Sequence, residues 1–263
     1  MATKAKPGIG PGELEITKIS TGVVTACILG DTPLIFNRMA EKAKRDLLLG
    51  GGRKTAADRA QNLKHNPPEE YRASVYRNSG NDAATRIRFP SPGFKGAMMT
   101  AALEIPGAKK SEVGRLVWVT STHVDVYGVP ELKMDVVRSA DMNRTPDIRT
   151  RAILPRWACQ VTIRFVEGKL NTTAVANLLY AAGLISGIGD FRQEKGKGNF
   201  GQFHLVEPDD VEYLDVMKTG SRAAQDSALA EYACYDEETQ ELIDFFSAQV
   251  TKLGRQPTGP TAP

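Results

Sequence analysis

The sequence has few of the residues that metal sites, disulfide frameworks and membrane spans require. It holds three cysteines and three histidines in 263 residues, and neither set has the spacing of a zinc knuckle, a CxxC pair or an HExxH helix. No apolar run approaches the roughly 18 residues that a membrane-spanning helix needs, and the first twelve residues lack the apolar core of an export signal. We therefore expect a cytoplasmic protein with reduced thiols, no metal, no cofactor and no membrane contact.

The motifs of common nucleotide-dependent and nucleophilic enzymes are missing as well. No GxxxxGK[ST] phosphate loop occurs, and the GxG at Gly187 and Gly189 has Arg192 where a dinucleotide fingerprint needs its third glycine. No GxSxG nucleophile elbow is present. Whether the chain is an enzyme stays open at this stage.

Charge is distributed unevenly along the chain. Residues 207–246 hold twelve Asp or Glu and two Lys or Arg, a net charge of −10, so the formal +3 of the whole chain leaves +13 for the rest. A basic body with an acidic segment indicates a polyanionic partner. The acidic segment is then either excluded from the site that binds this partner or competes with the partner for the site. A pair of solvated acidic helices is the alternative.

The most unusual stretch is a loop of five glycines between positions 187 and 201, which we call the glycine loop. Positive side chains are interleaved with the glycines, and flexible backbone N–H groups beside cations suit a polyanion. A plain hairpin turn is the alternative interpretation. The candidate residues for nucleic-acid contact in this loop are Gly187, Gly189, Arg192, Lys195, Lys197 and Gly198.

Two further segments are basic. Residues 38–95 hold thirteen Lys or Arg against six acids, and residues 138–156 hold five arginines against two acids. Solubilising surface is the alternative to a phosphate-binding role. Aromatic residues beside cations are typical of proteins that bind single-stranded nucleic acid, and four lie among or next to the cations of the first segment: Phe36, Tyr71, Tyr76 and Phe89. Each of them, taken singly, is better explained as a core residue. The candidate contacts are Lys42, Lys44, Arg45, Arg53, Lys54, Lys95, Arg144, Arg149 and Arg151.

Hydrophobic periodicity predicts an α+β fold. Strands are expected over 14–29, 115–127, 132–137, 157–165 and 200–206, and helices over 38–49, 55–63, 94–102, 171–183 and 238–253. The core order is βαββαβ, a ferredoxin-like, RRM-type plan with one sheet face covered by two helices and the other free. We expect a flexible arm (1–12), a main domain (13–206) with basic insertions (32–88 and 138–155), an acidic helical extension (207–253) and a disordered tail (254–263).

Two stretches carry a resemblance to a known family. "FPSPGFKGAMMTAA" and "GIGDFRQEKGKGNFGQFHL" resemble the helix-entry segment and the glycine-rich loop of the RAMP superfamily of CRISPR-associated proteins, and Cas7-like backbone subunits match best. The resemblance covers roughly residues 14–206. It implies subunits that assemble side by side along RNA, with a thumb at 138–155 that crosses to the next subunit. The stretch "GDTPLIFNRMAEKAKR" is more similar to phage-encoded proteins of unknown function than to a standard CRISPR subunit.

Three functions follow from these observations. The first is a Cas7-like protein that binds single-stranded nucleic acid, RNA more than DNA, and forms homo-oligomers along it within a larger ribonucleoprotein complex. The second is an endoribonuclease, since some Cas7-like subunits cut RNA with an Asp after the first strand, where Asp31 is the candidate match. Asp31 is otherwise a turn or capping residue before Pro33. The third is a phage structural or interaction protein.

Overall fold

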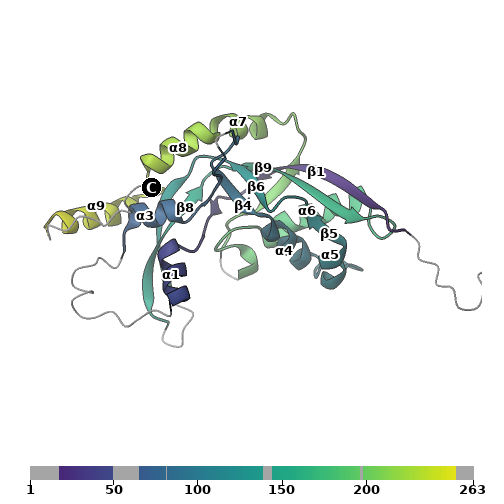
Figure 1. Ribbon diagram of the computed structural model, residues 1–263, viewed down its shortest axis with the longest axis horizontal. Coiled ribbons are helices and arrows are strands. Elements are labelled where there is room, and N and C mark those ends of the chain that lie inside the picture. The colour runs from purple at the N-terminus through teal and green to yellow at the C-terminus, as the bar shows by residue number, and fades with distance from the viewer. Residues whose placement is uncertain (1–17, 50–64, 81, 139–143, 196–197, 253–263) are drawn as a thin grey trace, which may run out of the picture.

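The computed structural model describes residues 18–49, 65–80, 82–138, 144–195 and 198–252, and it has the expected α+β class. Two antiparallel sheets and their covering helices make up an elongated body (Figure 1). The strands are β1 (Thr21–Gly30), β2 (Leu34–Ile35), β3 (Tyr76–Arg77), β4 (Ile87–Pro90), β5 (Val117–Val119), β6 (His123–Tyr127), β7 (Glu131–Arg138), β8 (Pro146–Leu154), β9 (Ala158–Val166) and β10 (Phe203–Val206). The helices are α1 (Glu41–Leu49), α3 (Pro67–Ala73), α4 (Ser91–Ala101), α5 (Lys110–Leu116), α6 (Thr172–Ala181), α7 (Val211–Thr219), α8 (Arg222–Ala230) and α9 (Glu237–Lys252).

The larger sheet has the strand order β10-β1-β9-β6-β4-β3, and β5 also pairs with β9. Its centre is the long antiparallel pair of β1 and β9, which runs from Thr21 opposite Val166 to Leu29 opposite Ala158. The strand predicted over 157–165 is confirmed, because Val161 and Ile163 are buried whereas the intervening side chains are not. Alternation of this kind is what a sheet with one fully covered face imposes.

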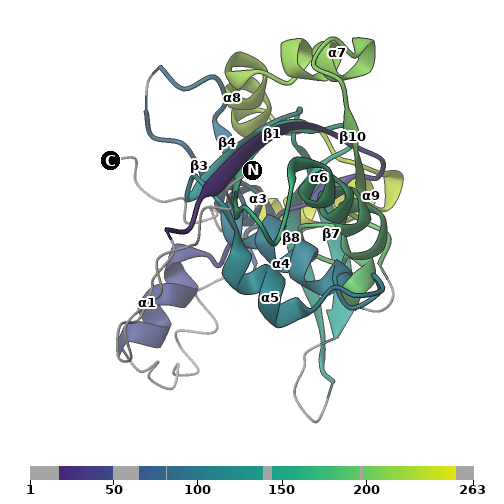
Figure 2. The ribbon, with the colours of Figure 1, turned by 90° about the vertical axis from the view of Figure 1, so that its right-hand side faces the viewer.

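The helices α4 and α6 cover one face of this sheet, which we call the inner face (Figure 2). The apolar face predicted for α4 is confirmed, with Phe94 and Met98 fully buried. The capping residue predicted for α6 is confirmed too, because the Asn171 side chain accepts a hydrogen bond of 2.8 Å from the Ala174 N–H. The sequence therefore identified both of the helices that back the sheet.

The smaller sheet has the order β2-β8-β7, and β7 and β8 form a long hairpin. The strand predicted near Leu132–Val137 is confirmed as β7. The segment 138–155 was predicted to be a protruding basic loop or hairpin, and the structure has the hairpin. Its C-terminal part does not protrude, because residues 150–154 are buried strand that pairs with β7 and packs on α3. The frequent arginines in this segment obscured its apolar end.

The basic segment 32–88 contributes to the core as well as to the surface. Leu34, Phe36, Tyr71 and Ile87 are fully buried, and β4 joins the larger sheet between β6 and β3. Its cations stay outside while its few apolar residues point inward, which overall composition does not reveal. The helix predicted over 55–63 lies outside the described residues.

The strand predicted over 115–127 is interrupted. Helix α5 extends to Leu116, and β5 and β6 pair with β9 separately, with residues 120–122 between them. The break changes the alternation, so that Val117 and Val124 both point to the core. Trp118 therefore points outward, opposite the exposed Arg164 of β9.

The sequence predicted that the outer face of the larger sheet, opposite α4 and α6, is free. In the structure this face is partly covered. Helix α7, from the acidic segment, packs Tyr213 and Val216 against Cys27, Leu29 and Ala158 at one end of this face. The carboxylates of α7 point away from the sheet, and Asp215 pairs with Arg156 at 3.0 Å. The other end of the outer face, around Thr25 and Arg164, stays exposed.

Gln225 of α8 holds the acidic segment to the larger sheet. Its fully buried amide accepts from the N–H groups of Arg86 and Ile87 at 2.8 Å, and it donates to the carbonyls of Val126, Gly128 and Gly220. We predict that Gln225→Ala lowers the free energy of unfolding by about 3 kcal/mol, because buried backbone groups lose their partners.

Urea denaturation followed by circular dichroism measures this loss. The control is Gln240→Ala on α9, an exposed side chain that bonds only Asp244, and it should cost less than about 0.5 kcal/mol. Equal costs for the two variants would contradict the role of Gln225.

Candidate nucleic-acid interface

The glycine loop begins after a π-helical turn, Ala182–Ser186, that continues α6. Gly183 was expected to end the helix, but the chain turns only at Gly187, which has a φ of 65°. Gly183 instead lets the helix approach β10, because a Cβ there would collide with the carbonyl oxygen of Phe203. The loop thus starts from a tightly packed corner.

Several amides of the glycine loop are engaged within the protein. Ile188 donates to the Gly201 carbonyl and Asp190 to the Ile35 carbonyl, each at 2.9 Å, and Gly187 donates to the Ala182 carbonyl. These N–H groups are therefore not free for a polyanion, contrary to expectation. Gly189 and Gly198 likewise lie where a side chain would collide with the backbone of Ile35 and Phe191. The glycines permit close packing of the loop.

A buried arginine joins the glycine loop to the β7–β8 hairpin. The guanidinium of Arg151 (β8) contacts the carboxylates of Asp190 in the loop and Asp135 on β7, and the residue is 4% exposed. Lys133 extends the network, because it lies 3.3 Å from Asp135 and 2.9 Å from Asp236, just before α9. Arg151, which we expected to contact phosphate, therefore has an internal role.

The exposed cations of the hairpin lie nearer its tip. Arg144 and Arg149 are both exposed, and residues 139–143 between the strands lie outside the described residues. The hairpin is fixed to α3 through His65, whose ring nitrogens lie 3.0 Å from Glu70 and 3.0 Å from Asp147. Two anchors thus hold the base of an arginine-bearing projection.

Helix α1 projects from the same side of the molecule as the hairpin, as Figures 1 and 2 both show. Arg45 is exposed, and Lys44 pairs with Glu41 at 3.0 Å. Arg53, Lys54 and Lys197 lie outside the described residues, as do the side chains of Lys42 and Lys195.

The two remaining candidates lie on the inner side as well. Lys95 is a half-buried residue of α4, and Arg192 pairs with Glu194 at 2.7 Å. A hydrogen bond of 3.0 Å from Thr100 to Glu194 joins α4 to the glycine loop. The structure thus places α4, the glycine loop and the hairpin base in one continuous region.

Asp31 meets a residue that the sequence did not suggest. Its carboxylate lies 2.6 Å from Nδ1 of His204 on β10, and the two side chains are 45% and 40% exposed. The turn that carries Asp31 is fixed to the end of the glycine loop, because Asp31 donates its N–H to the Gln202 carbonyl at 2.9 Å. The alternation of Gln202 and His204 opposite Phe203 was the only signal for this contact. A carboxylate–imidazole pair has the chemistry of a general acid or base.

Within the described ranges, no group of three His, Cys, Asp or Glu side chains is arranged to hold a metal ion. None of the helices that the structure describes is both long and apolar enough to cross a bilayer.

No protein-family model and no curated protein sequence matches the chain. Solved structures similar to it include a type III-B Cmr-beta complex bound to cognate target RNA, at a TM-score of 0.38 and 14% identity. The match covers 71% of this chain and 59% of that one, so this chain spans less than two thirds of its neighbour.

Two others are Cmr6 from Pyrococcus furiosus and a CRISPR RNA-guided surveillance complex. For Cmr6 the TM-score is 0.36 at 10% identity, over 71% of this chain and 98% of that one. For the surveillance complex it is 0.30 at 11% identity, over 88% and 84%. Likeness at these TM-scores and identities does not establish a family.

The His65 anchor predicts a pH-dependent stability. Its hydrogen bond to Glu70 raises the pKa of His65 above its ordinary value, against the opposing effect of burial. A raised folded-state pKa stabilises the protein fully below the unfolded pKa of about 6.5, and this contribution is lost as pH rises through the folded value. We predict that His65→Gln destabilises the protein more at about pH 6 than at about pH 9.

Urea denaturation at the two pH values gives the difference. His123→Gln is the control, because burial lowers the pKa of His123 and its contribution is lost on acidification instead. A His65→Gln effect that does not change with pH would rule out the charged anchor.

Proposed function

We propose that this protein is a Cas7-like subunit that binds single-stranded nucleic acid, RNA more than DNA. The observation that carries the proposal is the joining of the glycine loop to the arginine-bearing hairpin through Asp190 and Arg151. This ion pair places Arg144 and Arg149 on a fixed base beside α4 and the loop. Exposed arginines on a rigid projection suit the phosphates of a strand, largely without regard to sequence.

We further propose that the core is the ferredoxin-like βαββαβ arrangement. The larger sheet supports this through its order β10-β1-β9 followed by β5 and β6, all antiparallel, with α4 and α6 as the two connecting helices. In this proposal the bound nucleic acid follows the inner side of the molecule, where α1 and the hairpin project. The outer face, which α7 partly covers, is secondary, although Trp118 beside Arg164 offers one stacking position there.

Affinity for oligonucleotides tests the proposal. We predict that the double variant Arg144→Ala/Arg149→Ala binds a single-stranded RNA about tenfold more weakly than the wild type at low salt. The slope of log affinity against log salt concentration should also fall by about 0.7 for each phosphate that the variant no longer neutralises. Fluorescence anisotropy with labelled RNA and DNA of one sequence measures both effects.

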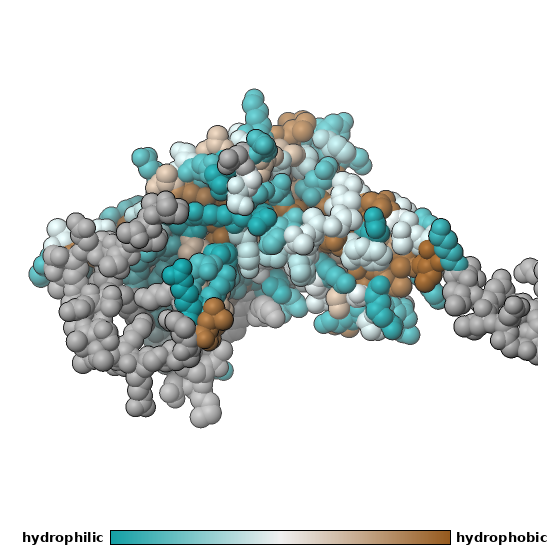
Figure 3. All heavy atoms as spheres, viewed as in Figure 1, coloured by the Kyte–Doolittle hydropathy of each residue, from teal (hydrophilic) through white to brown (hydrophobic). Residues whose placement is uncertain are grey.

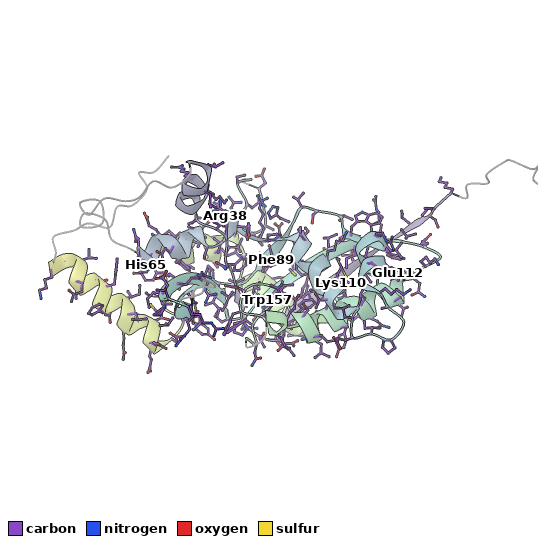
Figure 4. All side chains as sticks on the ribbon, turned by 90° about the horizontal axis from the view of Figure 1, so that it is seen from below. Arg38, His65, Phe89, Lys110, Glu112 and Trp157 are labelled. Atoms are coloured by element: carbon purple, nitrogen blue, oxygen red, sulfur yellow. The ribbon has the colours of Figure 1, made fainter. Side chains whose placement is uncertain are left out.

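The control is Arg115→Ala on α5, an exposed arginine at the opposite end of the molecule, where Figure 4 labels Lys110 and Glu112. It should leave affinity unchanged. Wild-type affinity that does not change with salt concentration would count against the proposal. If the purified protein has the ratio of absorbance at 260 and 280 nm of a protein free of nucleic acid, and also binds no RNA, the phage interaction protein is favoured.

We propose homo-oligomers along the strand, within a larger ribonucleoprotein complex and in the cytoplasm. The hairpin supports side-by-side assembly, because it projects from the body (Figures 1 and 2). Electron microscopy of the RNA mixtures tests assembly, and isolated single particles on long RNA would contradict it.

A second candidate function, an endoribonuclease, is favoured by the contact of Asp31 with His204. In metal-independent cleavage, a base takes the proton of the ribose 2′-hydroxyl, whose oxygen attacks the adjacent phosphorus. A 2′,3′-cyclic phosphate forms, and the expelled 5′-oxygen takes a proton from water. His204 has the chemistry of that base, and Asp31 orients its ring.

We predict that His204→Gln abolishes cleavage of RNA, that Asp31→Asn slows it at least about 100-fold, and that neither changes RNA affinity. Gel analysis of labelled RNA, with a deoxyribose substitution at the cut site as a substrate control, measures cleavage. Unchanged cutting by both variants would remove the candidate.

A further inference from the structure

A pocket separate from the glycine loop lies where β3 and β4 meet the segment before α1. It is lined by Arg38, Val75, Tyr76, Arg77 and Arg88 and encloses about 190 Å³. Helix α1 and β4 lie toward the viewer in Figures 1 and 3, on a face where hydrophilic residues predominate. Sites for drug-sized ligands have volumes of roughly 300 Å³ or more, so this pocket can enclose the phosphate group and part of a nucleotide but not the whole nucleotide.

The charged groups that line the pocket are all positive. Arg38 pairs with Glu41 outside the pocket, and Arg77 donates a hydrogen bond of 3.0 Å to the Arg72 carbonyl. No ion pair of Arg77 or Arg88 occurs among the described contacts, although Asp125 lies opposite Arg88 on β6. The Nε of Arg88 is buried without a hydrogen-bond partner. The guanidinium of Arg88 is therefore not fully paired within the protein, and an anion beside its other nitrogens would offset its charge.

The surroundings add to the positive potential. Burial lowers the pKa of Arg77, and the nearby charges of Arg86, Arg72 and Arg38 lower it further, whereas the charge of Asp226, which pairs with Arg86 at 2.6 Å, opposes them. Guanidinium groups present a planar set of donors that matches two oxygens of a phosphate. An anion at this place therefore gains hydrogen bonds and relieves the repulsion between like charges.

Tyr76 gives the pocket an aromatic wall. Of the four aromatic residues between positions 32 and 89, Phe36, Tyr71 and Phe89 are buried, whereas Tyr76 is partly exposed. The centre of its ring lies 5.9 Å from that of His123 on β6. A nucleobase can stack on such a ring while its phosphate contacts the arginines.

We infer that this pocket binds a nucleoside monophosphate unit, with the phosphate held by Arg38, Arg77 and Arg88 and the base against Tyr76. Figure 4 shows Arg38 beside α1, at the same end of the molecule as His65. The inference goes beyond the proposed function and does not depend on it, because none of the lining residues belongs to the hairpin or the glycine loop.

Calorimetric titration with uridine monophosphate, adenosine monophosphate, inorganic phosphate and uridine tests the inference. Both monophosphates should bind, each at least tenfold more tightly than uridine. Arg88→Gln and Tyr76→Leu should each weaken binding of the monophosphates about tenfold or more. The matched control is Arg164→Gln, an exposed arginine on β9 outside the pocket, which should bind as the wild type does.

Thermal melting of each variant shows whether it is folded, and Arg77→Gln replaces Arg88→Gln if that variant unfolds. No binding of either monophosphate, or equal affinity in wild type, Arg88→Gln and Tyr76→Leu, would overturn the inference. Arg144→Ala/Arg149→Ala should bind the monophosphates normally. Loss of RNA binding with retained monophosphate binding would contradict only the proposed function, and the reverse would contradict only the pocket.

Competition identifies the source of the unit. A 5′-phosphorylated oligonucleotide that displaces uridine monophosphate better than its 5′-hydroxyl form identifies a strand end as the ligand. Failure of both oligonucleotides to displace it identifies free nucleotides. Either result upholds the pocket.

Discussion

Arg151 is a cation held away from water, and its two carboxylate partners decide how the functional elements are placed. Removing an ion from water costs several kcal/mol, so a buried guanidinium is stable only when carboxylates surround it closely. Its partners come from β7 and from the glycine loop, and Lys133 extends the network toward α9. The hairpin and the glycine loop cannot move independently while these charges stay paired. The exposed arginines nearer the hairpin tip therefore start from a rigid base.

The sequence predicted the elements whose periodicity is strong. Strand β9 and helices α4 and α6 were found because one face of each is fully buried and the other is polar. The prediction from sequence failed where a break in a strand interrupts the alternation of buried and exposed residues. The break between β5 and β6 puts Val117 in the core together with Val124 and turns Trp118 outward, which unbroken alternation over 115–127 would not do. Arg151 looked like a surface cation because nothing in one strand reveals carboxylates that arrive from distant segments.

The candidate site was predicted in part. Asp31 and the arginines of the hairpin were identified from their neighbours in sequence, whereas His204 and the pocket around Tyr76 depend on pairing between strands far apart. The acidic segment was recognised by its charge, yet its role in the fold comes from Tyr213 and Val216 on the side that meets the sheet. Charge counting reveals what a helix shows to water but not what it covers. This is why the outer face looked freer in the sequence than it is.

The pairing of β1 with β9 has a consequence for how the chain is made. Thr25 contacts Thr162, a partner that follows 137 residues later. At roughly 5–20 residues per second, synthesis leaves β1 without this partner for about 7 to 27 s. During that time the apolar run from Cys27 to Leu29 has unpaired backbone on both edges, the state in which strands associate with other chains. Productive synthesis of this protein therefore depends on keeping its first strand away from its neighbours until the middle of the chain has left the ribosome.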